Sequence, residues 1–489
     1  MSLSNATRQD GLTVTEFEPL IKLLASYLQQ ANAGALPVLP YVDPDTMLQR
    51  WNLPIPASGK GMGDAFSLLS RTLAESNHLH HPRYIGHQVS APLPLAAFCD
   101  LVSALLNNST AAYEMAQVET VMEAHLVSWI AGLAGFDADR AGGLFTSGGS
   151  LGTLTALLAA RQVMGKRKGI GDLWRDGYAP TGPRPAVLVS AQAHYCVLRA
   201  AQIMGLGEQG IVPVRTDSAL RVDPSALAAA YETARLTGRE PIAVVANACS
   251  TPTGSYDPLA RIADFCVAKD LWFHVDGAHG FGAAMVPQYA SLLEGISRAD
   301  SLVWDLHKML RMPALCTAVV FRDKAHSYAT FAQDASYLFQ GTPEQEWYNL
   351  GQRTIECTKG MIALKAFICL QAYGTQYFAD YIAGRYALAR RFCDLLQASA
   401  DFECPVAPQA NIVCFRHVPA GASAAALDEL QGSIRQKLIA SGKFYITQTR
   451  LTGGLYLRVT LINPATQDSD LQVLLAEIRS VAAESTRRS

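Results

Sequence analysis

The stretch S-L-V-W-D-L-H-K, residues 301–308, is a short apolar run that ends in charged side chains. Such a run predicts a buried strand, with Asp305, His307 and Lys308 where that strand ends. A lysine in this place is costly to desolvate unless its amine is neutral or covalently used, and Schiff-base chemistry needs both conditions. Taken alone, Lys308 is better interpreted as a surface lysine at a strand end.

Similar apolar runs alternate with helical patterns on both sides of this stretch. They are P-A-V-L-V-S (185–190), G-I-V-P-V-R (210–215), I-A-V-V-A-N-A (242–248), L-W-F-H-V-D (271–276) and T-A-V-V-F (317–321). Strands and helices in alternation predict an α/β fold, with a largely parallel sheet covered on both faces. In such folds ligands bind at the carboxyl ends of the strands, which is where Lys308 would lie.

The chain divides into three predicted parts. Residues 1–95 have helical patterns broken by proline-rich segments, which predicts an N-terminal segment that wraps a neighbour instead of folding alone. Residues 96–374 form the large domain. Residues 375–489 carry two helical stretches, two strand-like runs (411–415 and 455–462) and a closing helix, which predicts a small α/β domain.

Composition narrows the class of partner. The chain has 489 residues, 49% of them hydrophobic, and a net charge of −2, so no field favours nucleic acid or an anionic membrane. We therefore expect a small-molecule ligand. No apolar run approaches the ~20 residues that cross a bilayer, and no leader is evident, so we expect a cytoplasmic protein. The ten cysteines include no C-x-x-C pair and indicate reduced core thiols, not a metal site.

A second acidic strand end precedes Lys308 by some thirty residues. The run L-W-F-H-V-D-G-A-H-G ends its apolar part at Asp276. Pyridoxal 5′-phosphate (PLP), a cofactor that binds lysine, is an electron sink only while its pyridine nitrogen is protonated, and an aspartate against that nitrogen keeps the proton there. Asp276 fits this role, and Ala278 is small enough to leave room for the ring. The alternative for Asp276 is a plain turn residue.

A glycine-rich loop and two strand-to-helix junctions contain the remaining candidates for a cofactor site. In T-S-G-G-S (146–150), Gly148, Gly149 and Ser150 open a helical pattern, and a helix N-terminus with glycines accepts phosphate. The loop alone is weak evidence. His194 in A-H-Y-C could stack on a cofactor ring, or be satisfied by backbone. Thr251 in S-T-P-T-G-S-Y-D-P could supply a hydroxyl, although a turn before a helix explains it as well.

Together, T-S-G-G-S, A-H-Y-C, S-T-P-T-G-S-Y-D-P, H-V-D-G-A-H-G and D-L-H-K-M-L resemble the group II PLP-dependent amino-acid decarboxylases. This family includes glutamate, cysteine-sulfinate, aspartate, diaminobutyrate and aromatic amino-acid decarboxylases. The resemblance covers residues 80 to 480 approximately and implies fold type I, with a mostly parallel seven-stranded sheet. It implies that Lys308 binds PLP covalently, Asp276 pairs with the pyridine nitrogen, and His194 stacks on the ring. It also implies that Gly148, Gly149, Ser150 and His307 lie near the phosphate.

Q-D-A-S-Y-L-F-Q-G (333–341) followed by E-W-Y-N-L-G-Q-R-T-I-E-C (346–357) resembles the mobile catalytic loop of the family's acidic-substrate branch. The resemblance implies that Tyr348 delivers a proton to the substrate α-carbon after CO2 leaves. A positioned acid is needed there, because slow protonation lets the carbanion partition into transamination or oxidation. An ordinary loop aromatic beside Trp347 is the alternative.

Three further residues are candidates for substrate binding. L-Y-L-R-V-T-L-I-N-P-A-T resembles the family's C-terminal strand, which implies that Arg458 binds the substrate α-carboxylate through its planar fork. H-P-R-Y-I-G-H-Q-V-S resembles the substrate entry loop and makes His87 and Gln88 pocket candidates. An exposed strand arginine and an ordinary loop are the alternatives.

Two departures from the family pattern bear on the substrate. Gly277, Ala278 and His279 follow Asp276 where many relatives have two alanines and an aromatic, and Asp305-Leu306 replaces Asn-Pro before His307. We expect α-decarboxylation of an L-amino acid, and favour glutamate, aspartate or cysteine sulfinate. The alternatives are a basic substrate such as 2,4-diaminobutyrate, another PLP reaction (aminotransfer or retro-aldol cleavage), or an inactive homologue. The resemblance also implies a homodimer with active sites at the interface, in which Tyr348 reaches the other protomer's cofactor.

Overall fold

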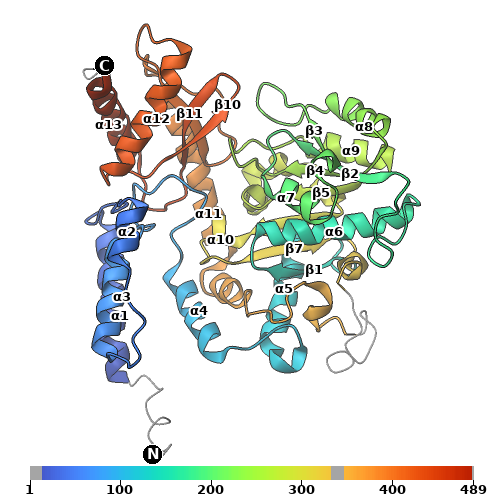
Figure 1. Ribbon diagram of the computed structural model, residues 1–489, viewed down its shortest axis with the longest axis horizontal. Helices are drawn as coiled ribbons and strands as arrows, with labels where there is room; N and C mark the ends of the chain where they lie inside the picture. Colours follow the sequence, from blue (N-terminus) through green and yellow to red (C-terminus); the bar gives the residue numbers. More distant parts are fainter. Residues whose placement is uncertain (1–13, 332–345, 487–489) are drawn as a thin grey trace, which may run out of the picture. The chain divides into compact units, whose positions relative to one another are not determined.

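The computed structural model describes residues 14–331 and 346–486 (Figure 1). Two compact units make up the described chain. The large unit consists of Gln88–Asp394 and Cys404–Val413, and the remaining described residues form the small unit. The predicted division of the chain at residues 96 and 375 stays a prediction.

A seven-stranded sheet forms the centre of the large unit. Its strands are β1 (Gly142–Thr146), β2 (Arg184–Ser190), β3 (Ile211–Val214), β4 (Arg239–Asn247), β5 (Trp272–Asp276), β6 (Ser301–Asp305) and β7 (Thr317–Phe321), in the order β1-β7-β6-β5-β4-β2-β3. The pairs β2–β3, β2–β4, β4–β5 and β5–β6 are parallel. The predicted α/β fold with a mostly parallel sheet is confirmed.

Strand β7 runs against its neighbours, a detail that the apolar pattern did not reveal. It pairs antiparallel with both β6 and β1. A parallel crossover needs a dozen or more residues, usually with a full helix. Between β6 and β7 lie only residues 306–316, with the short helix α10 (Leu306–Met309), so the chain turns back.

The large unit also contains eight described α-helices. They are α4 (Pro94–Leu106), α5 (Gln117–Leu133), α6 (Gly149–Arg167), α7 (Cys196–Ile203), α8 (Ala226–Leu236), α9 (Leu259–Lys269), α10 and most of α11 (Leu364–Gln397). Of these, α5, α6, α8, α9 and α10 contact strands of the sheet. Helix α6 packs against β1, β4, β5, β6 and β7, and Figure 1 shows it lying over these strands. It is buried along nearly its whole length, with small residues such as Ala156, Ala159 and Ala160 against the sheet. This close packing fixes the start of α6 at the strand ends.

Shorter elements connect these helices and strands. The 3-10 helices are η2 (Tyr113–Met115), η3 (Glu208–Gly210), η4 (Gly280–Met285), η5 (Pro287–Leu293), η6 (Ile296–Arg298), η7 (Lys324–Tyr328) and η8 (Leu350–Arg353). Helix α11 is interrupted at Gly374, whose φ of 73° is a left-handed conformation that glycine adopts readily.

The small unit combines N-terminal helices with a C-terminal α/β layer. Its helices are α1 (Val14–Asn32), α2 (Pro44–Arg50), α3 (Met62–Glu75), α12 (Ala424–Ala440) and α13 (Asp468–Thr486). Strands β8 (Phe402–Glu403), β9 (Ile412–His417), β10 (Thr447–Leu451) and β11 (Gly454–Thr460) form a sheet in the order β10-β11-β9-β8. Helix α12 packs on β11 and α13. The strand-like runs that sequence analysis found near 411 and 455 correspond to β9 and β11.

Within the described residues, no helix combines the length and the apolar character that a membrane span requires. All ten cysteines are free thiols; eight are buried and Cys357 is exposed.

Candidate active site

A cavity of about 200 Å³ lies in the large unit where the strands end. Strands β1, β2, β4, β5 and β6 share one direction, so their carboxyl ends meet at one edge of the sheet. The lining residues are Gly149, Ser150, Thr153, His194, Cys196, Cys249, Thr251, Asp276, Ala278, His279, Asp305, His307 and Lys308. This edge is the place where open α/β sheets bind ligands.

Lys308 lies on helix α10, three residues after the end of β6. Its Nζ is 2.7 Å from Oδ2 of Asp305, and Oδ1 of Asp305 accepts a hydrogen bond of 2.6 Å from the Thr317 hydroxyl. Burial disfavours the ammonium, but the carboxylates of Asp305 and Asp276 outweigh it, so the pKa of Lys308 is raised above its ordinary value. The cavity wall therefore holds a lysine cation next to a buried carboxylate.

Asp276 is the last residue of β5 and is buried. Its Oδ1 accepts a hydrogen bond of 3.1 Å from the backbone N–H of Ala278. Burial raises the pKa of Asp276, and the nearby Lys308 counteracts only part of that rise. A second carboxyl group with unusual proton affinity thus lines the same cavity, as expected of a functional site.

His194 lies between the end of β2 and the start of α7. Its Nδ1 accepts a hydrogen bond of 3.3 Å from the backbone N–H of Cys196, and its ring centroid is 4.1 Å from that of Tyr195. Burial lowers the pKa of His194, although Asp276 opposes this shift. The imidazole is consequently neutral at neutral pH, which suits a ring that stacks on a cofactor.

The N-terminus of α6 forms another wall of the cavity. Gly149 and Ser150 line it, and Gly148 precedes them as the N-cap residue. The first N–H groups of a helix have no acceptor inside the helix and can bind an anion. A Cβ at Gly149 would lie 3.0 Å from both carboxylate oxygens of Asp305, so a side chain there would crowd that carboxylate. Sequence analysis singled out this loop for its glycines.

His307 and Thr251 also line the cavity, where sequence analysis expected them. His307 Nδ1 is 3.0 Å from the backbone oxygen of Cys316, and burial lowers the pKa of this imidazole. Thr251 lies four residues after the end of β4, at the start of a turn. Each candidate for cofactor binding except Gly148 thus has a place among the lining residues.

Four other candidate residues are not among the residues that line this cavity. Tyr348 is not among the cavity-lining residues within the described ranges; its ring packs 5.1 Å from that of Tyr113. Gln88 does not line the cavity either, and its Nε2 is buried with no hydrogen-bond partner among the described residues. Arg458 and His87 belong to the small unit. Of the loop motif, residues 333–341 lie outside the described residues.

Arg458 and His87 lie near each other within the small unit. Arg458 is buried and its Nη1 donates to the backbone oxygen of Gly86 and to the Thr447 hydroxyl, at 3.3 Å each. The His87 ring centroid is 5.5 Å from that of Tyr445. Their roles in substrate binding stay predictions.

Sequence analysis missed several cavity residues. Thr153 lies one helical turn after Ser150, and Cys196 lies two residues after His194, so spacing along a helix start could have indicated both. Cys249 lies in an ordinary turn and gave no signal. His279 was noted only as a departure from a family pattern, and Asp305 as such a departure and as a strand end, without a role for either. The structure places both in the cavity wall, with His279 Nε2 2.6 Å from Oδ1 of Asn411.

Comparisons with known proteins identify the class to which this site belongs. Residues 45–418 match the family model described as the pyridoxal-dependent decarboxylase conserved domain. The aromatic-L-amino-acid decarboxylase of Bacillus atrophaeus is 28% identical over 451 residues, 92% of this chain and 91% of that protein. The aspartate 1-decarboxylase of Aliivibrio fischeri is 30% identical over 461 residues, 86% of this chain and 82% of that protein. The crystal structure of mouse CSAD in apo form matches with a TM-score of 0.87 at 25% identity, covering 96% of this chain and 99% of that one.

The chain therefore belongs to the pyridoxal-dependent decarboxylase family. It is a PLP-dependent amino-acid decarboxylase, as sequence analysis predicted, and PLP is its cofactor. The names of the two relatives refer to aromatic and acidic amino acids, so sequence similarity alone does not identify the substrate of this chain.

The residues around the cavity suit this cofactor by their chemistry. The N-terminus of α6 offers N–H groups to a phosphate, and Gly149 carries no side chain beside them. Lys308 supplies an amine for an aldehyde. Asp276 supplies a buried carboxylate for a pyridine nitrogen, and Ala278 beside it is small.

Proposed function

We propose that this decarboxylase holds PLP on Lys308 and removes the α-carboxylate of an L-amino acid, with acidic amino acids preferred. One observation carries the proposal: Lys308, Asp276 and His194 come from three different strand ends and line a single cavity. Residues so far apart in the sequence that converge on one cavity with shifted pKa values are typical of a catalytic site.

The roles of the residues follow from their chemistry. Bound PLP supplies an electron sink for the pair left when the carboxylate departs as CO2. Asp276 holds a proton at the pyridine nitrogen, and the neutral His194 ring packs against the cofactor. The N–H groups of Gly149 and Ser150 bind the phosphate. Lys308 would hold the cofactor through its amine.

Tyr348 is the proposed proton donor to the substrate α-carbon. Its ring packs against Tyr113, and the neighbouring Met115 and Val118 are apolar residues that are half or more exposed, at 50% and 61%. Tyr348 thus lies beside an apolar surface that a second copy of the chain would cover. This supports its assignment to the other protomer's cavity. A Tyr348→Phe variant should release CO2 but form less amine, with aldehyde or transamination products instead.

A homodimer with active sites at its interface is part of the same proposal. Helix α4 supports it, because Phe98, Val102 and Leu105 recur at helical spacing and are 51%, 48% and 70% exposed. Contiguous exposed apolar side chains mark interaction surfaces, and symmetric dimers are the commonest oligomers. Light scattering on the eluting protein tests this; a fully active monomer would contradict it.

The preference for an acidic substrate rests on resemblance in segments 334–358 and 455–466, of which 334–345 lie outside the described residues. Arg458 is assigned to the α-carboxylate, which every substrate carries, so it does not decide the side chain. The rival is a basic substrate such as 2,4-diaminobutyrate, because D-L-H-K and H-Q-V-S do not match the acidic branch closely. An Arg458→Lys variant should raise KM for every substrate alike, since lysine lacks the planar fork.

A CO2-release assay with product analysis tests the proposed function. The purified enzyme is offered glutamate, aspartate, cysteine sulfinate, 2,4-diaminobutyrate and the aromatic amino acids, all in the L form, and kcat/KM is compared. We expect the highest value for one of the three acidic substrates, with the amine as product. A highest value for 2,4-diaminobutyrate or an aromatic amino acid would overturn the preference, and no CO2 from any of them would overturn the proposal.

A further inference from the structure

Two cysteines of the large unit lie in direct contact outside the cavity. Cys393 is close to the end of α11, and Cys404 follows β8 and begins the segment Cys404–Val413, which belongs to the same unit as Cys393. Their Sγ atoms are 3.2 Å apart. Neither residue lines the cavity. Their separation of 11 positions matches no motif, so sequence analysis did not single them out.

We propose that Cys393 and Cys404 form an oxidation site, at which a peroxide converts the two thiols into a reversible disulfide. The physical basis is their proximity. The sulfurs of a disulfide are about 2.05 Å apart, so closure of this pair requires a movement of about 1 Å. A small rotation of either side chain supplies such a movement. The inference is independent of the roles proposed for Lys308 and Asp276.

The two thiols differ in exposure. Cys404 is partly exposed, whereas Cys393 is buried. A peroxide in solution therefore reaches Cys404 first, and Cys393 is within reach as the second thiol. The hydrogen bond with Cys404 lowers the pKa of Cys393 and outweighs the burial that raises it. This favours the thiolate of Cys393, which is the form that attacks an oxidised sulfur.

Most other cysteines of the chain are less suited to oxidation. Burial raises the pKa of six further thiols and so disfavours their reactive thiolate form. They are Cys99, Cys196, Cys266, Cys316, Cys369 and Cys414. Cys357 is exposed, and it serves below as the comparison for the reach of the peroxide.

The segment that carries Cys404 is fixed by contacts further along its length. Asn411 is fully buried, and its Oδ1 lies 2.6 Å from Nε2 of His279. Gln409 Oε1 accepts the backbone N–H of Tyr256 at 2.8 Å. These contacts lie within the large unit. The proximity of the two sulfurs is thus a property of the folded unit, and we expect the disulfide to form in the native enzyme.

The reaction balances with hydrogen peroxide as the oxidant. The Cys404 sulfur attacks one peroxide oxygen, the O–O bond breaks, and a sulfenic acid and a water molecule form. The Cys393 sulfur then attacks the sulfenic sulfur, the S–S bond forms, and a second water molecule leaves. The two thiols lose two electrons and two protons, which reduce the peroxide to water. A dithiol reductant reverses the step by thiol–disulfide exchange.

The test follows both cysteines in the full-length holoenzyme, reduced beforehand with a dithiol that is then removed. Samples exposed to rising hydrogen peroxide are alkylated with iodoacetamide in denaturant, digested without reduction and analysed by mass spectrometry. We expect Cys393 and Cys404 to lose alkylation together and to appear as one linked peptide pair, while most of Cys357 is still alkylated. The dithiol should restore both thiols. Alkylated Cys393 and Cys404 at a peroxide dose that oxidises Cys357 would overturn the inference.

Serine variants separate the two thiols. Cys393→Ser leaves Cys404 without its second thiol, so Cys404 should accumulate as a sulfenic acid, which dimedone traps, and then as the irreversible sulfinic acid. Cys357→Ser should leave the linked pair unchanged. If Cys393→Ser fails to fold, the wild-type and Cys357→Ser enzymes decide alone. A disulfide from Cys404 to a different cysteine in the native wild type would contradict the inference.

The unfolded chain provides the matched control for the fold. Cys414 lies almost as far from Cys404 along the sequence as Cys393 does. In urea, the links from Cys404 should therefore divide between Cys393 and Cys414, whereas the native enzyme should give the Cys393 link alone. An equal division in the native enzyme would show that the fold does not create the pair, and would overturn the inference.

Discussion

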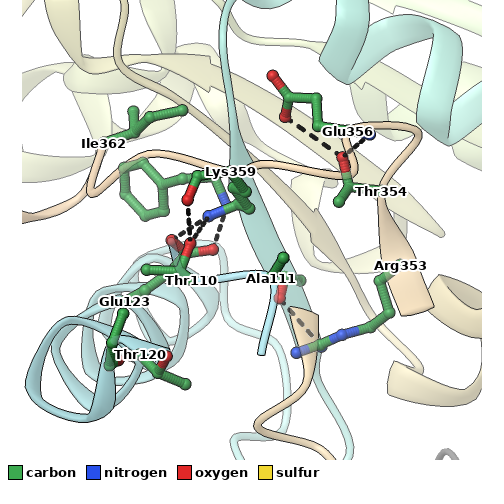
Figure 2. Close-up of polar contacts among 12 residues, drawn as sticks. Thr110, Ala111, Thr120, Glu123, Arg353, Thr354, Glu356, Lys359 and Ile362 are labelled. Atoms are coloured by element: carbon green, nitrogen blue, oxygen red, sulfur yellow. Dashed lines mark hydrogen bonds and ion pairs between the residues drawn. The ribbon is translucent and has the colours of Figure 1, made fainter. Parts of the chain in front are cut away.

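The large unit contains two lysine–carboxylate pairs that differ in their access to a cavity. Lys308 pairs with Asp305 at 2.7 Å, and its side chain is 19% exposed in the cavity wall. Lys359 pairs with Glu123 at 2.5 Å, with side chains that are 0% and 2% exposed (Figure 2). The more deeply buried of the two lysines is the one outside the cavity, so burial of a lysine does not by itself mark a catalytic residue.

The partners of Lys359 explain the difference. Its Nζ also donates to the Thr110 hydroxyl at 3.2 Å, and its backbone oxygen accepts the N–H of Thr110 at 2.7 Å. Glu123 uses its second oxygen to accept the N–H of Phe145 in β1 at 2.8 Å. Figure 2 shows Glu123, Thr110 and Lys359 joined by these contacts. The pair ties α5, β1 and the chain before α11 together, whereas Lys308 keeps a face toward the cavity.

The largest expected effect comes from removing the lysine in the cavity. Lys308→Ala should lower kcat/KM for decarboxylation at least about a thousandfold, because the covalent attachment of the cofactor is lost. Its urea midpoint should change less than that of a Lys359 variant, since cavity water can solvate the remaining Asp305. The CO2 assay and urea unfolding measure the two effects. Near-normal activity of this variant would contradict the role given to Lys308.

The buried pair of Lys359 and Glu123 should show the opposite pattern, with its main effect on stability. Lys359→Met leaves the Glu123 carboxylate buried without a cation, which costs about 3–5 kcal/mol of unfolding free energy. The combined variant Lys359→Met/Glu123→Gln should regain most of this loss, because no uncompensated charge remains. Urea unfolding measures both. A single variant as stable as the wild type would show that the pair is not structural.

The smallest effect concerns the carboxylate of the cavity pair. Asp305→Asn should cost about 1–2 kcal/mol at pH 7, where a charge-assisted hydrogen bond is lost. Because the pKa of Asp305 is held below its usual value, this contribution is present above about pH 4 and fades as the pH falls through the folded-state pKa. Urea unfolding from pH 7 down to pH 3 follows it. A difference from wild type that grows toward low pH would contradict the sign.

The fold was predictable because most strands of the large sheet are short apolar runs that alternate with helical patterns. The direction of β7 was not, since T-A-V-V-F is equally apolar in either direction and the reversal lies in the connection 306–316. Three central residues of the candidate site were predictable from their positions relative to the predicted strands. Asp276 ends strand β5, while Lys308 and His194 lie a few residues after β6 and β2, and parallel strands bring such positions to one edge.

The rest of the site depends on information that spacing does not contain. Cys249 lines the cavity only because of how its turn folds, and no motif marks it. No apolar strand precedes Lys359 in the sequence, and its partner Glu123 lies 236 positions away. The roles of Tyr348 and Arg458 rest on sequence resemblance alone.

Reduction of the enzyme with borohydride tests the central claim most directly. Borohydride fixes a Schiff-base cofactor as a stable pyridoxyl group, which proteolysis and mass spectrometry then locate. We predict the label on the peptide that contains Lys308, with Lys359 unmodified as the internal comparison. A pyridoxyl group on any other lysine, or on none, would contradict the account.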